Sequence, residues 1–230
     1  NVLCDHYDVD VFAHSWSTEM KDEILSTWNP KKHLIEKQIE FYPDIKKYGE
    51  SFDLDQLAKD RRYGPSVKYH SKYDYSQSPH SSPEEGEKYF WKHVEKLVWR
   101  AHSRWYSNSK CIELKKEYQK ETGTEYDFVL LTRFDVFYNT RFNLEELDKN
   151  CFYGGARYSD GGKQRHDYDF ALEDFWYLAG SDVMDKFGSK VYNNIYDYCW
   201  DSPYSAREVA NEIVGEENVK LLLKARGGKD

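Results

Sequence analysis

The amino-acid sequence predicts an α/β domain with a mostly parallel sheet and helices on both of its faces. Short apolar runs of strand length alternate along the chain with longer segments whose apolar residues recur every three or four positions. The length of 230 residues suits one domain. Residues 1–230 are therefore expected to form a single domain, with a long irregular insertion at about 43–83.

The first elements are predicted from local patterns. Residues 8–16 indicate a short buried strand that ends in polar residues. Ser17 or Thr18 can cap a following helix with an apolar stripe, which Pro30 ends. This stripe consists of Ile24, Leu25 and Trp28. Residues 33–41 are expected to form a second strand, whereas residues 43–83 predict no regular element and are typical of a functional or mobile loop.

The clearest helical pattern follows Pro83. Its apolar residues have three- and four-residue spacing: Phe90, Val94, Leu97, Val98, Ala101 and Trp105. A second helical stretch carries Cys111, Leu114 and Tyr118 and should end near Gly123. Residues 126–131 then predict the most hydrophobic strand of the chain.

The last third of the chain is predicted to continue the alternation. Residues 143–150 indicate a helical turn, and two further strands are expected at 151–155 and 174–180. Ser181 can cap the next helix, and Ser205 with Glu208 forms a capping box for a helix through Val214. Residues 218–223 predict the last strand.

Composition and charge exclude several classes of protein. The formal charge of -8 and the pI of about 5.6 argue against non-specific nucleic-acid binding. The four cysteines include no C-x-x-C pair, which excludes the usual zinc motifs and a dense disulfide framework and predicts a reducing, cytoplasmic location. The sequence shows no signal peptide and no apolar run of membrane-spanning length. Its 20 tyrosines indicate either compositional bias or a surface that binds through aromatic rings.

Polar residues follow two of the predicted strands at the point where each strand ends. Arg133 and Asp135 come after residues 126–131, and His14 follows the first strand. Ligands of a parallel sheet bind at this edge. A carboxylate there can hold a divalent cation against a diphosphate, and the planar fork of an arginine suits phosphate oxygens. The structural alternative is that Arg133 simply pairs with Asp135.

Two acidic residues, Glu173 and Asp174, stand at the beginning of another predicted strand. They would share the edge with Arg133 and Asp135 in two cases only. Either the acids belong to a loop that precedes the strand, or the strand runs antiparallel. The sequence leaves both cases open.

Three segments in this order, residues 9–16, 126–139 and 174–187, resemble nucleotide-sugar glycosyltransferases of the GT-A fold. The likeness is to bacterial and viral enzymes that decorate surface polysaccharides. It implies a GT-A-like fold and the transfer of a sugar from a nucleotide-diphosphate sugar to a glycan or glycolipid hydroxyl. It also implies an earlier strand, which would precede Asn1.

The resemblance implies roles for the strand-end residues. Enzymes of this family bind the sugar nucleotide beside an Asp-x-Asp motif, usually through Mn2+ or Mg2+. Here Arg133-Phe134-Asp135 retains only the second acid. Asp135 is therefore the expected metal or diphosphate residue, Arg133 is expected to bind the diphosphate, and the need for a metal stays open.

Glu173 and Asp174 resemble the catalytic acids of the family. In an inverting enzyme, Asp174 would take the proton from the acceptor hydroxyl. In a retaining enzyme, Asp174 would instead contact the donor sugar.

Further residues are expected to bind substrate. His14, Ser15 and Trp16 would line the nucleotide side, and Arg104 could reach a phosphate, as could Arg100 or His102 on the same helix. Asp169, which follows His166 and Asp167, could belong to a metal or acceptor loop. Tyrosines of the long insertion could stack on an acceptor glycan: Tyr69, Tyr73 and Tyr75.

Two other functions fit the sequence. A metal-dependent phosphoesterase could use His166 together with the acids Asp167, Asp169, Glu173 and Asp174. A non-catalytic carbohydrate-binding domain would suit the tyrosine content and the absent first strand.

Overall fold

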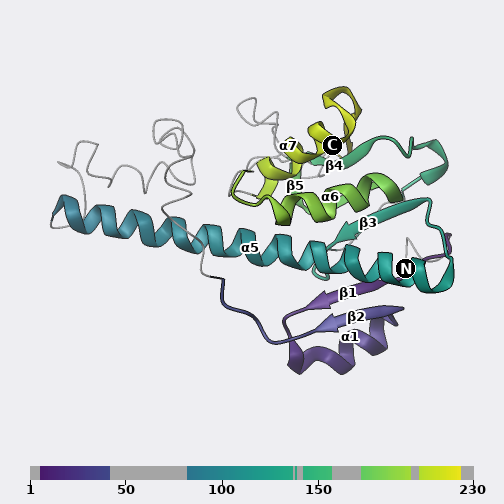
Figure 1. Cartoon of the computed structure of the whole chain (residues 1–230), viewed down its shortest axis with the longest axis horizontal. Helices are drawn as coiled ribbons and strands as arrows, with labels where there is room; N and C mark the ends of the chain where they lie inside the picture. Colours follow the sequence, from purple (N-terminus) through teal and green to yellow (C-terminus); the bar gives the residue numbers. More distant parts are fainter. Residues whose placement is uncertain are drawn as a thin grey trace, which may run out of the picture. The chain divides into compact units, whose positions relative to one another are not determined.

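The computed structural model describes residues 6–41, 82–136, 138, 142–156, 172–197 and 202–223 (Figure 1). Two compact units are distinguished. One consists of Asn1–Ile39 with Arg104–Asp230, and the other of Glu40–Ser103. The strands, and the residues at the ends of β1 and β3, belong to the first unit. None of the described helices is long and apolar enough to cross a lipid bilayer.

The chain begins with a small parallel sheet. Strands β1 (Phe12–Ser15) and β2 (Lys32–Ile35) pair in parallel, and the crossover between them carries η1 (Thr18–Met20) and α1 (Lys21–Trp28). This order of strand, helix and strand confirms the sequence prediction. The helix ends just before Pro30, as predicted, and Asn29 closes it in a left-handed conformation with φ 43, its N–H donating to the carbonyl of Leu25.

Helix α5 (Pro83–Thr122) is one continuous helix of 40 residues, where the sequence predicted two helical stretches. No proline or glycine occurs after Gly86 within it, so nothing interrupts its backbone hydrogen bonds. The predicted end is confirmed: Gly123 has φ 74, and its N–H donates to the carbonyl of Gln119.

The main sheet has four strands in the order β3-β5-β4-β6. They are β3 (Phe128–Thr132), β4 (Phe152–Ala156), β5 (Leu172–Gly180) and β6 (Val219–Leu223). Strand β5 runs antiparallel to both β3 and β4, and only β4 and β6 pair in parallel. The α/β class is therefore confirmed, but the expectation of a mostly parallel sheet holds only for β4–β6 and for β1–β2. Hydrophobic patterns reveal where strands lie, not the direction in which they pair.

Helices α5 and α6 (Ser181–Asn193) cover one face of this sheet. The Tyr177 ring of β5 lies parallel to Trp105 of α5 with centroids 6.3 Å apart, and it also contacts Phe187 of α6. Phe152 of β4 approaches Phe187 to 4.6 Å. All four aromatic side chains are buried. Their contacts bind both helices to the sheet.

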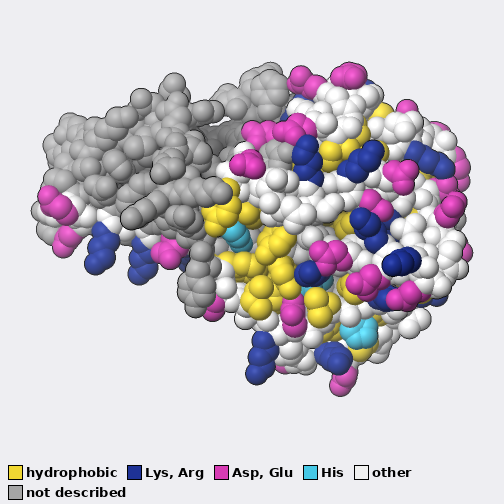
Figure 2. Space-filling model, in the orientation of Figure 1, with side chains coloured by type: hydrophobic (Ala, Val, Ile, Leu, Met, Phe, Trp, Pro, Cys, Tyr) yellow, Lys and Arg dark blue, Asp and Glu magenta, His cyan; other side chains and the backbone are white. Residues whose placement is uncertain are grey.

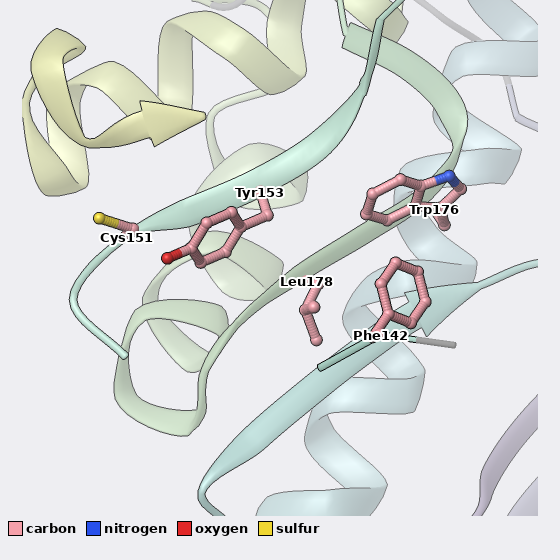
Figure 3. Packing of buried hydrophobic residues seen from close by; sticks show 5 residues of the cluster. All are labelled: Phe142, Cys151, Tyr153, Trp176 and Leu178. Atoms are coloured by element: carbon pink, nitrogen blue, oxygen red, sulfur yellow. The ribbon is translucent and has the colours of Figure 1, made fainter. Parts of the chain in front are cut away.

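The opposite face is covered by a loop. Trp176 and Leu178 alternate with Tyr177 along β5 and pack against Phe142, together with Tyr153 and Cys151 (Figure 3). Leu144 and Leu147 add to this cluster, and residues 144–146 form the predicted helical turn, η2 (Leu144–Glu146). The described residues thus place a loop with a single 3-10 turn, rather than an α-helix, on this face. This corrects the expectation of helices on both faces.

Three predicted helix caps also need correction. Ser17 precedes η1, but its side chain makes no capping hydrogen bond. Ser181 is the first residue of α6, so the N-cap position belongs to Gly180. Helix α7 (Ser202–Val214) begins before Ser205, so Ser205 and Glu208 do not form its start. After η4 (Glu216–Asn218), the chain enters β6.

Helices α5 and α6 approach each other closely at a glycine. A Cβ atom added at Gly188 would overlap the side chain of Ile112, which is itself buried. One turn away, the Lys115 ammonium donates to Asp185 at 2.7 Å, with the Lys115 side chain only 2 % exposed. The close contact and the buried ion pair together fix how these two helices meet.

We expect Gly188→Ala to lower the free energy of unfolding by about 1–3 kcal/mol, because the added methyl group overpacks the contact. Alanine in a solvated helix would instead raise stability by roughly 1 kcal/mol over glycine. Urea denaturation measures the change. The exposed helix position Asn193 provides a control, since Asn193→Ala should be neutral or stabilising. A stabilising Gly188→Ala would contradict the close packing.

Candidate functional site

The residues that follow β3 form a charged pair. The Nε–H of Arg133 donates to Asp135 Oδ1 at 2.8 Å, and a second guanidinium N–H donates to Oδ2. The guanidinium also lies over the Phe175 ring, 5.3 Å from its centroid. Asp135 remains 64 % exposed in its side chain. The structure thus contains the pairing that the sequence left open as the structural alternative.

The charged pair sets the protonation of Asp135. Hydrogen bonding from Arg133 lowers the pKa of Asp135, burial opposes this, and the charges of Arg133 and, to a smaller extent, Arg104 lower it further. Asp135 is therefore ionised at neutral pH. Arg104 lies on α5, partly buried, and its positive charge acts on the end of β3.

The antiparallel direction of β5 brings a second pair of acids to the same edge. Thr132, the last residue of β3, is opposite Trp176, and the Arg133 N–H donates to the Phe175 carbonyl at 3.3 Å. The backbone of Glu173 and Asp174 therefore lies next to the turn that carries Arg133. Of the two cases that the sequence left open, the antiparallel one applies. The side chains of these two acids lie outside the described residues.

Metal binding stays a prediction from the sequence. They contain no group of three or more His, Cys, Asp or Glu side chains that could hold a metal ion. Asp135 supplies hard oxygen ligands, but a cation there would share the carboxylate with the Arg133 guanidinium or displace it. Other residues that the sequence singled out, His166, Asp167 and Asp169, lie outside the described residues. The same holds for Tyr69, Tyr73 and Tyr75.

The last two residues of β1, His14 and Ser15, form a separate cluster with Trp16, which follows the strand. Because β1 pairs with β2 and not with β3, His14 and Arg133 do not follow strands of one sheet, which corrects the expected shared edge. His14 Nε2 lies 3.3 Å from Glu36 Oε1, and the Tyr106 hydroxyl donates to the same oxygen at 3.1 Å. Ser15 Oγ accepts a bond from the Ser17 N–H.

Aromatic rings surround this polar contact. The Trp16 indole stacks on Tyr106 with centroids 5.2 Å apart, and His14 meets both rings edge-on. Tyr192 of α6 and the Lys110 ammonium also approach Tyr106. Figure 2 shows hydrophobic side chains at the surface near the carboxyl end of β1. His14 and Trp16 thus contact each other and Tyr106.

Burial determines the charge states in the cluster. It lowers the pKa of His14, while hydrogen bonding and the charge of Glu36 act in the opposite direction and Lys110 adds to the lowering. Burial and Glu36 raise the pKa of Tyr106 to about 12. His14 is consequently neutral at pH 7 and Tyr106 is protonated. Both act as neutral hydrogen-bonding groups rather than as charges.

Sequence reasoning did not identify Glu36 or Tyr106. Glu36 directly follows β2, so the strand-end rule that selected His14 and Arg133 would have found it. No local sequence pattern marks Tyr106, because its contacts with Glu36 and Trp16 join residues that are distant in the sequence. Two candidates on the same helix lie in the other unit: Arg100 is exposed, whereas burial lowers the pKa of His102 to about 4.

We expect Glu36→Gln to lower the pKa of His14 further, because the variant removes the negative charge that opposes desolvation. NMR titration of the His14 ring protons measures this. Since the folded state holds His14 below its unfolded pKa of 6.5, the unfolded state binds more protons and stability falls as the pH drops below that value. A lower folded-state pKa of His14 should widen the pH range over which the stability of the variant falls. Glu121→Gln, a change on α5 that removes a partner of Lys32 and none of the groups acting on His14, serves as control. An unchanged His14 titration in Glu36→Gln would contradict the contact.

Comparison with known proteins adds no family assignment. The chain matches no protein-family model, and no curated protein and no solved structure is significantly similar to it. Function is therefore inferred from the residues and their geometry.

Proposed function

We propose that this chain is a nucleotide-sugar glycosyltransferase with a GT-A-like domain. It would move a sugar from a nucleotide-diphosphate sugar to a glycan or glycolipid hydroxyl. The observation that carries the proposal is the antiparallel pairing of β3 and β5, which joins the Glu173–Asp174 backbone to the turn of Arg133 and Asp135. Arg133, a cation that could bind a diphosphate, and two acidic residues that could accept a proton thus belong to the same end of the β3–β5 pair.

Arg133 is assigned to the leaving diphosphate. Its planar guanidinium is held by Asp135 and by the Phe175 ring, so little conformational freedom is lost when it binds phosphate oxygens. Negative charge develops on the diphosphate as the bond to the sugar breaks, and a preorganised cation stabilises that charge. The charge of Arg104 acts in the same direction.

Asp135 is assigned to organising the diphosphate. Its ionised, exposed carboxylate could do so through Arg133 or through a bound Mn2+ or Mg2+. Such a cation would supply additional neutralisation of phosphate charge. The proposal does not require it, because Arg133 stands where the resembling enzymes have their first acid.

Asp174 is assigned to the acceptor, with Glu173 beside it. In an inverting reaction, the acceptor oxygen forms a bond to the anomeric carbon and its proton passes to Asp174. The bond between that carbon and the diphosphate oxygen breaks, and the electron pair leaves with the nucleotide diphosphate. In a retaining reaction, Asp174 would contact the donor sugar instead.

We further infer a reducing compartment, the cytoplasm, as the place of action. Cys111 and Cys151 are free thiols. Burial raises the pKa of Cys111 to about 11, which keeps it protonated and unreactive. Thiols of this kind persist where disulfides do not form.

A thermal-shift panel of UDP-, GDP-, dTDP- and CMP-sugars, each with and without Mn2+, tests donor binding. One donor should raise the melting temperature, because a ligand at 100 times its Kd stabilises the folded state by about 2.7 kcal/mol. Arg133→Ala should reduce this shift. Asp174→Asn should keep the shift and lose most of the transfer, by about 100-fold or more.

Lys149→Ala provides a matched control, since it also removes an exposed cation that pairs with an aspartate. It should change neither donor binding nor transfer. Flat responses across the whole panel would count against the proposal. Release of free phosphate without sugar transfer would instead support the phosphoesterase that the acidic residues also suggested.

A further inference from the structure

Three exposed aromatic side chains are linked to the turn that carries the charged pair: Phe134 belongs to the turn, Trp28 contacts Phe134, and Phe175 contacts Arg133. Trp28, Phe134 and Phe175 are 37 %, 43 % and 42 % exposed. Among the described residues, these are the exposed tryptophan and phenylalanine side chains. Large rings are usually buried in folded proteins, so a group of exposed rings at one place points to a ligand.

The three rings come together from separate elements. Trp28 is the last residue of α1, and its ring lies 5.8 Å from that of Phe134, which follows Arg133 in the turn after β3. Phe175 belongs to β5, and its carbonyl accepts the Arg133 N–H. The Arg133 guanidinium covers one part of the Phe175 ring. We call these three rings with Arg133 and Asp135 the aromatic edge.

The chemistry of the aromatic edge suits a carbohydrate. Pyranose rings present C–H faces that pack on aromatic rings, and they carry adjacent hydroxyls that bond to planar groups with two polar atoms. Asp135 and Arg133 are such planar groups, and Asp135 is largely exposed. Trp28 and Phe134 already contact each other, and Phe175 contacts the Arg133 guanidinium, so binding orders few side chains.

Two other occupants fit less well. The cores of protein interfaces are depleted in aspartate, whereas the ionised Asp135 belongs to this group. An anionic lipid surface attracts patches rich in Lys and Arg, but Asp135 is an ionised acid and the chain carries a formal charge of -8. Neither the ionised Asp135 nor the negative formal charge opposes the binding of a neutral oligosaccharide.

We propose that Trp28, Phe134 and Phe175 form a binding surface for a neutral glycan, which holds the acceptor chain beside Arg133 and Asp135. The role as acceptor surface rests on the proposed transferase function; the binding of a glycan does not. The rings pack against the C–H faces of the sugars, and Arg133 and Asp135 form hydrogen bonds that orient the sugar hydroxyls. The acceptor hydroxyl then lies at the strand edge to which Asp174 belongs.

The test uses the full chain without any nucleotide sugar. A printed array of neutral oligosaccharides is screened first, and affinities for its best ligand and for maltohexaose, cellohexaose and chitohexaose are then measured by calorimetry. Trp28→Ala and Phe175→Ala should each weaken binding about tenfold or more. Trp28→Phe, which keeps a ring, should retain most of the affinity. Leu221→Ala removes an equally exposed apolar side chain elsewhere and should bind like the wild type. Circular dichroism and thermal melting verify that each variant is folded.

The outcomes separate this inference from the proposed function. Glycan binding that depends on the rings, without any response to nucleotide sugars, supports the surface and counts against the transferase. Sugar transfer by a chain that binds no oligosaccharide of the array overturns the surface and leaves the transferase. Equal affinities in Trp28→Ala, Phe175→Ala and the wild type overturn the surface as well. Binding of the rings to phosphatidylserine vesicles, with no glycan bound, would also overturn it.

Discussion

The antiparallel pairing of β3 and β5 is the interaction on which the rest of the structure depends. It runs over five residue pairs, from Phe128 opposite Gly180 to Thr132 opposite Trp176. From Trp176 onward both faces of β5 are buried, with Tyr177 against the helices and its neighbours Trp176 and Leu178 against the loop cluster. A shift of one residue would exchange these faces. The register is therefore strongly specified, and with it the position of the β5 acids beside the charged pair.

Much of the order of elements could be predicted from local sequence, but the direction of the strands could not. The apolar run at 126–131 and the glycine that ends α5 at Gly123 are local signals, and both proved correct. Strand direction depends instead on which backbone groups pair, and an apolar run reads the same in either direction. The continuity of α5 escaped prediction for a related reason, because polar residues such as Asn108 and Ser109 look like an interruption until tertiary contacts bury them.

In the candidate site, too, local sequence signals predicted some residues, whereas others depend on tertiary contacts. Arg133 and Asp135 could be located because a charged pair directly after a buried strand is visible in the sequence. The aromatic edge could not, because exposure is a tertiary property. Trp28 was predicted on the apolar stripe of its helix together with Ile24. The structure buries Ile24 and leaves Trp28 exposed, where it meets Phe134.

Backbone NOE measurements test the central claim, that β5 runs antiparallel to β3 in the register that joins the acids to the charged pair. Because Arg133 and Phe175 form a hydrogen-bonded pair, the alternate positions are the close, non-hydrogen-bonded ones, about 4.5 Å apart between Cα atoms. We expect strong Hα–Hα NOEs between Leu130 and Leu178 and between Thr132 and Trp176. Strong NOEs between Leu130 and Tyr177, or a parallel pattern without close Hα pairs, would contradict the claim.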